Sequence, residues 1–192
     1  MMFTVGILTV SDKGWRGERE DVSGKVAREV LSRLDVSVVK SDIVPDEKEV
    51  IVRKLVQWAD EDKLDVIVTT GGTGLTKRDV TPEATLSVVD RVVPGFAEAM
   101  RHESLKKTPM AVLSRAVAGV RGECLIINLP AAPTGCATAW KRSFPPSPTP
   151  WKRLSGTDLD FIPASGYNAP QLNIVSPSCL RLKRNLRRAT GR

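Results

Sequence analysis

The sequence predicts a three-layer α/β/α fold built on a mostly parallel sheet. Short apolar runs alternate with amphipathic segments along the first two-thirds of the 192 residues. Three of the apolar runs have the length and composition of buried strands: residues 3–12, 65–70 and 123–129. A further strand is predicted at residues 37–44, where apolar and polar residues alternate. A parallel sheet of this kind binds its ligands at the carboxyl ends of its strands.

Four helices are expected between these strands. The first begins at the N-cap Ser23 and extends to Leu34, with apolar residues at helical spacing. The second ends near Asp60. The last two cover residues 82–89 and 95–105. Pro82 is the first residue of one and Pro94 immediately precedes the other, and proline favours the start of a helix.

A glycine-rich turn follows the third predicted strand, in the stretch TTGGTGLTKRDVTPEAT at residues 69–85. Backbone N–H groups can approach an anion closely in such a turn, because glycine has no Cβ in the way. Asp79 lies just before the helix-start signal at 81–83, and a carboxylate beside a phosphate site indicates a bridging metal. The spacing matches neither a Walker A loop nor GxGxxG.

Polar residues also end the other predicted strands, at Ser11-Asp12, Pro45-Asp46-Glu47 and Asn128-Leu129-Pro130. The carboxyl ends of parallel strands share one edge, so we expect these residues near the glycine-rich turn. Simple turn formation explains the first pair equally well, and taken alone it is the better explanation of Asp46. Asp79, for its part, could only be an acidic group near a helix start.

Composition argues against several classes of protein. No apolar run approaches the roughly 20 residues of a membrane span, and the N-terminus lacks the basic segment of a signal peptide. The three cysteines, Cys124, Cys136 and Cys179, are odd in number and lack CxxC spacing, which argues against disulfides or a zinc site. The chain has one histidine, His102, so Ser-His or Cys-His catalysis is not expected. We predict a cytoplasmic protein.

The net charge of +7 is unevenly distributed. Residues 1–130 carry 19 basic and 20 acidic side chains, whereas residues 131–192 carry 10 and 2. A uniformly basic domain would suggest a nucleic-acid surface, but the excess lies entirely in a proline-rich tail that ends in a basic run. The simplest interpretation of that composition is a disordered tail.

Residues 3–130 resemble the MogA/MoaB family of molybdenum-cofactor biosynthesis proteins, the molybdopterin adenylyltransferases, whose domain also occurs in gephyrin. Six segments in one order carry the resemblance: GILTVSD at 6–12, VPDE at 44–47, TTGGTG and RDVTPEAT within 69–85, VPGFAEAMR at 93–101, LSRAVAGVRG at 113–122 and LIINLP at 125–130. The resemblance implies the three-layer fold, a homo-oligomer (trimer or hexamer) and a molybdenum insertase as pathway partner.

The resemblance further implies Mg²⁺-dependent adenylylation of molybdopterin by ATP, with release of pyrophosphate. It assigns catalytic and metal-binding roles to Asp46 and Asp79, whose carboxylates would hold Mg²⁺ between two anionic substrates. Binding of substrate or nucleotide is implied for Ser11, Asp12, Thr70, Gly71, Gly72, Thr73, Gly74, Ser114, Asn128 and Pro130. Arg115 could bind the pterin phosphate or could be structural.

The resemblance stops at Pro130, where the family continues with Gly-Ser-Pro and an amphipathic helix. This chain has Ala131-Ala132-Pro133 instead. With one nucleotide restored, residues 131–156 can be back-translated into GSPNGVRDCLEAVLPALPHALEKAIG, which is similar to the family's C-terminal segment. We therefore predict a domain at 1–130 and a frameshifted tail at 131–192, which sequencing of the gene near codon 130 would test.

Other functions stay open at this point. A module of the same fold could hold molybdopterin without turnover, although the presence of both Asp46 and Asp79 speaks against it. A nucleic-acid-binding protein could act through the basic tail, and truncation at residue 130 would then abolish a steep salt dependence. A nucleotide pyrophosphatase of related fold is a weaker alternative. The sequence does not separate MogA from MoaB, or molybdenum from tungsten.

Overall fold

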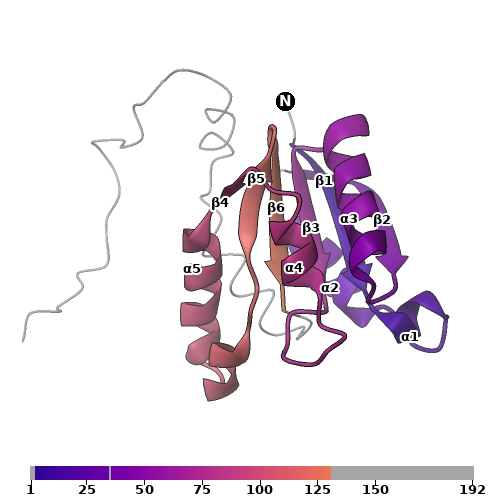
Figure 1. Cartoon of the computed structure of the whole chain (residues 1–192). Helices are drawn as coiled ribbons and strands as arrows, with labels where there is room; N and C mark the ends of the chain where they lie inside the picture. The colour runs from indigo at the N-terminus through magenta and orange to yellow at the C-terminus, as the bar shows by residue number, and fades with distance from the viewer. Residues whose placement is uncertain (1–2, 35, 131–192) are drawn as a thin grey trace, which may run out of the picture. The chain divides into compact units, whose positions relative to one another are not determined.

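The computed structural model describes residues 3–34 and 36–130. The predicted tail at 131–192 lies outside the described residues, and so do Cys136 and Cys179. Helices and strands alternate along the described chain, as Figure 1 shows, and the predicted α/β/α class is confirmed.

Six strands form one sheet in the order β2-β1-β3-β6-β5-β4. Their bounds are β1 Phe3–Val10, β2 Val36–Val44, β3 Val66–Thr70, β4 Arg91–Val92, β5 Ala118–Arg121 and β6 Cys124–Leu129. The first four in spatial order are parallel, and β5 is antiparallel to both of its neighbours. The sequence did not predict β4 or β5, because strands of two and four residues are too short to show a period of two.

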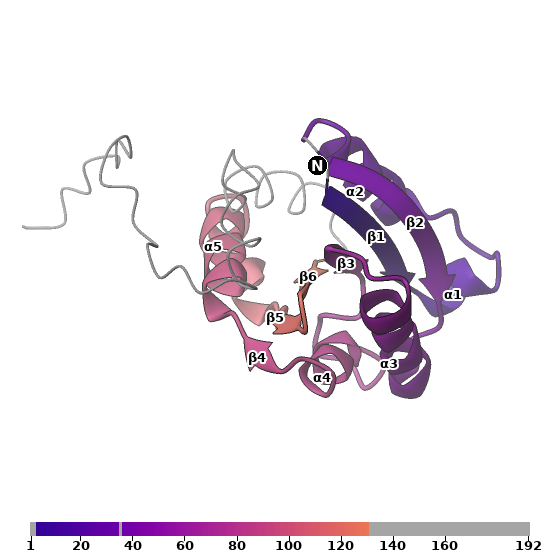
Figure 2. The same ribbon diagram turned by 90° about the horizontal axis from the view of Figure 1, so that it is seen from above.

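The helical segments are α1 Asp12–Trp15, α2 Val22–Leu31, α3 Lys48–Val56, α4 Thr81–Leu86 and α5 Pro94–Leu105, with a π-helical turn η1 Gln57–Glu61 and a 3₁₀ turn η2 Pro109–Leu113. Viewed from above in Figure 2, α3 and α4 lie on one side of the sheet and α5 on the other. Within the described chain, no helix is long and apolar enough to cross a membrane.

Two apolar cores fill the spaces between sheet and helices. One packs α2 and α5 against the sheet through residues such as Leu31, Met100 and Ile127. The other packs α3, η1 and α4 against the opposite face, around Leu55 and Ile126. Alternate residues of β6 thus enter opposite cores, as expected for a strand that is buried on both faces.

The start of α2 differs from the sequence-based expectation. Its N-cap is Asp21 and not Ser23, because the Gly24 N–H donates to Asp21 Oδ1 at 2.8 Å. The Thr9 hydroxyl donates to Asp21 Oδ2 at 2.8 Å, so a tertiary contact with β1 fixes this cap. The helix also ends at Leu31, one turn earlier than the predicted end at Leu34.

Candidate functional site

The carboxyl ends of β1, β2, β3 and β6 meet at one edge of the sheet. The chain reverses its direction of winding between β1 and β3, since β2 lies on one side of β1 and β3 on the other. Such a switch point is where open α/β sheets bind ligands. The predicted residues Ser11, Asp12, Asp46 and the 71–74 turn all follow strands at this edge.

The glycine-rich turn is held in a shape that only glycine can adopt. Gly71 and Gly72 have φ angles of 101° and 61°, in the left-handed region that disfavours side chains. A Cβ on Gly71 would stand 2.2 Å from the Val10 carbonyl oxygen at the end of β1. The turn therefore packs backbone against backbone, which leaves its outer side open to a ligand.

Asp46 and Asp79 both lie close to this turn. The position of a Cβ on Gly72 is 3.3 Å from Asp46 Oδ1, and that of a Cβ on Gly74 is 3.0 Å from Asp79 Oδ2. The Thr76 N–H donates to Asp79 Oδ2 at 2.7 Å and fixes its carboxylate. The structure therefore brings together the two carboxylates that the sequence placed 33 positions apart.

Burial raises the pKa of both carboxyl groups, but the net shifts have opposite directions. Desolvation raises the pKa of Asp46 above its ordinary value and outweighs the hydrogen bond from the Asp12 N–H. For Asp79, desolvation also acts to raise the pKa, but hydrogen bonds from Thr76 and Gly74 and the charge of Arg115 outweigh it, so the pKa is lowered. Asp79 thus stays ionised at a pH at which Asp46 begins to bind a proton.

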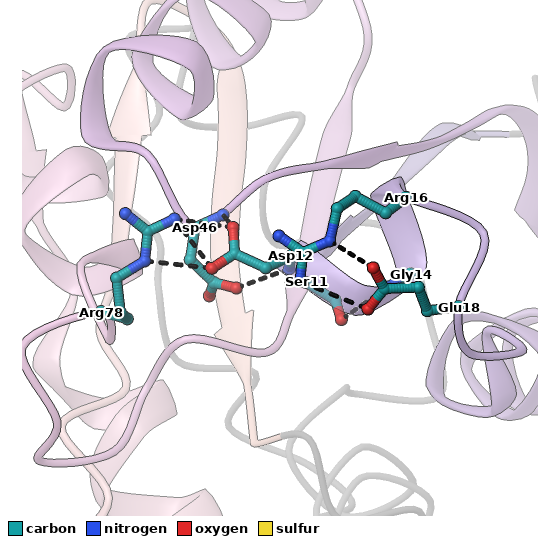
Figure 3. A network of polar contacts seen from close by, with 7 residues as sticks. All are labelled: Ser11, Asp12, Gly14, Arg16, Glu18, Asp46 and Arg78. Carbon is teal, nitrogen blue, oxygen red and sulfur yellow. Dashed lines mark hydrogen bonds and ion pairs between the residues drawn. The ribbon is translucent and has the colours of Figure 1, made fainter.

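Asp12 and Asp46 hold each other through reciprocal hydrogen bonds (Figure 3). The Asp12 N–H donates to Asp46 Oδ2 at 2.8 Å, and the Asp46 N–H donates to Asp12 Oδ1 at 3.0 Å. Ser11 caps α1, since its Oγ accepts from the Gly14 N–H at 3.1 Å. The two hydrogen bonds between Asp12 and Asp46 hold the loops after β1 and β2 next to each other.

Arg78 adds a cation that sequence reasoning missed. Its guanidinium engages the Asp12 carboxylate with Nε at 3.0 Å from Oδ2 and Nη2 at 2.6 Å from Oδ1. The hydrogen bond from Arg78 is the main cause of the lowered pKa of Asp12. The signal was present in the sequence, because Arg78 immediately precedes Asp79 in a loop that was itself singled out.

Arg115 is structural in the described chain. Its Nε donates to the Gly74 carbonyl at 2.7 Å, Nη2 donates to the Asp79 carbonyl, and Nη1 pairs with Glu83. Its backbone N–H donates to the Thr73 carbonyl at 3.0 Å. Arg115 therefore ties the two ends of the 74–79 loop to the start of α4.

Removal of the Arg115 side chain should disorganise that loop. We expect Arg115→Met to lower the free energy of unfolding by about 2–3 kcal/mol, because two carbonyls lose charge-assisted hydrogen bonds. Ligand binding at the loop should weaken with it. Thermal denaturation checks this, with Arg33→Met as control, since Arg33 pairs with Glu29 on the exposed surface of α2. Equal melting temperatures in the two variants would contradict the assigned role.

A pocket of about 440 Å³ opens beside the turn. Six of the predicted residues line it, together with side chains of α5 and η2 such as Met100 and Met110: Gly72, Thr73, Gly74, Asp79, Ser114 and Pro130. The volume is within the range of sites for small molecules. A heterocycle in this pocket would lie next to Asp79.

Other predicted residues do not line this pocket. Asn128 is fully buried, and its amide donates to the Thr69 and Thr85 hydroxyls at 3.0 and 2.8 Å. Its Oδ1 accepts from the Val117 N–H at 3.3 Å. Thr70 is buried at the end of β3. The structure thus places Asn128 behind the turn as a support between β6 and α4, without an open face toward a ligand.

The donor set at this edge fits a magnesium ion. Within the described ranges, 3–34 and 36–130, no three His, Cys, Asp or Glu side chains are grouped to hold a metal. Mg²⁺ needs fewer, because it takes one or two carboxylates and completes its shell with water and phosphate oxygens. Asp46 and Asp79 would supply these carboxylates. The buried hydroxyl of Thr81, which has no hydrogen-bond partner in the described chain, lies near Gly72 together with Asp46 Oδ1, whereas Asp79 lies near Gly74.

Comparison with known proteins gives a consistent result. Residues 6–148 match the family described as probable molybdopterin binding domain. The matched region extends beyond Pro130. The domain boundary and the frameshift predicted at that point concern residues 131–192, which lie outside the described residues. Molybdopterin adenylyltransferase of Helicobacter pylori J99 is 44% identical over 146 residues, which are 75% of this chain and 83% of that protein. The Escherichia coli K12 protein of the same name is 40% identical over 67% of each chain.

Solved structures agree with the fold. The molybdopterin biosynthesis enzyme MoaB from Thermus thermophilus superposes with a TM-score of 0.75 at 52% identity, over 81% of this chain and 98% of that one. The tungsten cofactor synthesizing protein MoaB from Pyrococcus furiosus gives a TM-score of 0.66 at 39% identity, over 73% and 89%. A neighbour named for molybdopterin biosynthesis and one named for tungsten cofactor synthesis thus share this architecture.

Proposed function

This chain belongs to the family of probable molybdopterin binding domains, and from that premise we propose that it adenylylates molybdopterin with ATP. The observation that carries the proposal is that the carboxylates of Asp46 and Asp79 both lie next to the glycine-rich turn, beside Gly72 and Gly74. Relatives named molybdopterin adenylyltransferase, at 40–44% identity, support it. The product would be adenylyl-molybdopterin, with pyrophosphate as leaving group.

The reaction sets clear demands on the site. A phosphate oxygen of molybdopterin attacks the α-phosphorus of ATP, and the bond to the β-phosphate oxygen breaks. Both reactants are anions, so catalysis consists mainly of positioning and charge compensation. The turn at 71–74 offers backbone N–H groups to phosphate, and the pocket beside Asp79 would hold one heterocycle against it.

Mg²⁺ is part of this proposal. Asp46 and Asp79 would hold the ion, which when bound offsets phosphate charge and supports the leaving pyrophosphate. Without a metal ion, the negative charges of Asp12, Asp46 and Asp79, which nearby arginines offset only in part, would repel the anionic substrates. The carboxylates therefore make sense at an anion site only together with a metal.

A binding module without turnover is the second candidate of the same fold. Mass spectrometry of molybdopterin incubated with the protein, ATP and Mg²⁺ distinguishes the two. A gain of one adenylyl group supports the enzyme. Retention of unmodified molybdopterin on the protein, with ATP intact, would favour the module.

The resemblance also leads us to propose a homo-oligomer, a trimer or hexamer, that passes its product to a molybdenum insertase in the cytoplasm. Four apolar side chains close together in the chain are exposed in the described part of the protein and could be covered by a second copy: Leu105, Met110, Val112 and Leu113. Light scattering of the purified protein measures the mass of the assembly. A monomeric mass would remove this part of the proposal.

The frameshift hypothesis makes its own prediction. A version with the reading frame restored after codon 130 should melt at a higher temperature and turn over faster than the present chain. The reason is that the restored segment would form an amphipathic helix whose apolar face is buried against the domain. Differential scanning calorimetry compares the two proteins, and an unchanged or lower melting temperature would contradict the hypothesis.

A further inference from the structure

We infer that Arg78 binds a phosphate oxygen of the substrates and that Asp12 is the positioning residue that holds its guanidinium. The inference rests on the proposed function and adds a cation to a site otherwise made of carboxylates and backbone. In this inference Asp12 acts on the substrates through Arg78, whereas the sequence predicts that Asp12 binds substrate or nucleotide directly.

The Asp12 carboxylate uses one edge of the guanidinium. Nε of Arg78 donates to Oδ2 at 3.0 Å, and Nη2 donates to Oδ1 at 2.6 Å and to Oδ2 at 2.8 Å. No described residue accepts a hydrogen bond from Nη1. The second edge of the planar group therefore remains able to donate to a phosphate oxygen while the first stays anchored (Figure 3).

The carboxylate of Asp12 is itself fully engaged. Its Oδ1 accepts from Arg78 and also from the Asp46 N–H at 3.0 Å, while its Oδ2 accepts from Arg78 alone. An ionised carboxylate has no donor for a phosphate and repels it. Any favourable effect of Asp12 on substrate binding must therefore pass through Arg78, through Asp46 or through a bound metal ion, and the titration in EDTA removes the last of these.

The position of Arg78 is suited to a reacting phosphate. It precedes Asp79 in the chain, and its partner Asp12 donates its N–H to Asp46 Oδ2 at 2.8 Å. The side chain is about half exposed, so an incoming ligand can reach it. A guanidinium fixed by one carboxylate and open on its other edge is a typical receptor for a phosphate oxygen.

Direct binding tests the role of Arg78. The probes are the α,β-methylene analogue of ATP, which cannot transfer its adenylyl group, and molybdopterin, each titrated by calorimetry with Mg²⁺ and again in EDTA. We expect Arg78→Met to weaken at least one probe by ~10–100-fold, the loss typical of a charge-assisted hydrogen bond. Arg78→Lys should recover only part of it, because lysine lacks the planar fork.

Arg16→Met is the matched control. Arg16 is also an exposed cation whose charge is felt by Asp12, but it pairs with Glu18 on the adjoining turn. The control substitution removes the same charge from the same region, so it should change affinity by about twofold at most. Melting temperatures of both variants show whether the fold is kept.

The role of Asp12 is tested by whether Asp12→Asn strengthens or weakens the binding of the two probes. If Asp12 is only a nearby negative charge, its neutralisation strengthens the binding of anions. If it positions Arg78, the same substitution weakens binding by ~3–10-fold, and the double variant with Arg78→Met binds within about twofold of Arg78→Met alone. Full additivity of the two substitutions would contradict the positioning role.

The possible outcomes distinguish a failure of this inference from a failure of the proposed function. If the wild-type protein binds both probes and Arg78→Met binds them with the same affinity as Arg16→Met, the inference about Arg78 is wrong. The proposed adenylyltransferase activity is then unaffected. Weaker binding of the ATP analogue alone assigns Arg78 to the nucleotide, and weaker binding of molybdopterin alone assigns it to the pterin phosphate. Wild-type protein that binds neither probe overturns both proposals.

Discussion

Replacement of Asp79 or Asp46 by asparagine should reduce the rate of adenylylation by at least about 10³-fold, because each substitution removes several kcal/mol of charge compensation between two anionic reactants. Asparagine keeps the shape of the side chain. The Thr76 N–H can still donate to an oxygen at position 79, and the Asp12 N–H to an oxygen at position 46. Single-turnover rates measured with saturating ATP, molybdopterin and Mg²⁺ check this.

Stability provides the control for these variants. Melting temperatures should stay close to that of the wild type, because neither carboxylate is paired with a cation in the described chain. Asp42→Asn is a matched substitution on the surface, where Asp42 of β2 pairs with Lys54 of α3, and it should leave the rate unchanged. Undiminished turnover in both Asp46→Asn and Asp79→Asn would remove the proposed mechanism.

The rate should also fall on the acid side at a higher pH than an ordinary aspartate would produce. Burial raises the pKa of Asp46, so this group takes up a proton first as the pH falls, and a protonated carboxyl holds Mg²⁺ poorly. Asp79, with its lowered pKa, is still ionised there. In an Asp46→Glu variant that is still active, the pH at which the rate falls on the acid side should change. If that pH is unchanged, a group other than Asp46 causes the fall.

Gly71→Ala should have the largest effect on stability, about 3 kcal/mol, or roughly 10 °C in Tm. Two costs add at this position. The φ angle of 101° is unfavourable for a residue with a Cβ, and that Cβ would lie 2.2 Å from the Val10 carbonyl oxygen, a backbone atom of a buried strand that cannot turn aside. Denaturant unfolding monitored by circular dichroism measures the loss.

Substitutions at two other glycines distinguish the cost of the positive φ angle from the cost of the steric clash. Gly17 has a φ of 72° and open space around its Cβ position, so Gly17→Ala should show the conformational cost alone, about 1 kcal/mol. Gly95, on α5, has open space and no positive φ, so Gly95→Ala should be neutral or slightly stabilising. If Gly71→Ala destabilises no more than Gly17→Ala, the close approach to β1 is not a real constraint.

The sheet edge could be predicted from the sequence because each of its parts has a local signature. The buried strand before the turn, the glycines themselves and the carboxylates after strands all leave marks within a few residues. Parallel pairing then forces the ends of β1, β2 and β3 together, so Asp46 and the 71–74 turn were predicted as neighbours without any knowledge of contacts.

Long-range side-chain partners could not be predicted in the same way. Arg78 pairs with Asp12, 66 positions away, and Arg115 reaches the 74–79 loop from beyond α5. Neither pairing follows from periodicity, because an arginine on a loop has the same local pattern whether it faces solvent or a carboxylate. Asn128 is a further case: its place at a strand end predicts a ligand contact, and the structure adds a partner that no local pattern indicates, because its buried amide joins Thr69 to Thr85.

Pyrophosphate release tests the central claim most directly. The purified protein is mixed with ATP and Mg²⁺, with and without molybdopterin, and pyrophosphate is followed over time. The proposed function predicts release that requires molybdopterin and equals the adenylyl-molybdopterin formed. Molybdopterin that binds without any release, or release that is the same in its absence, would contradict it.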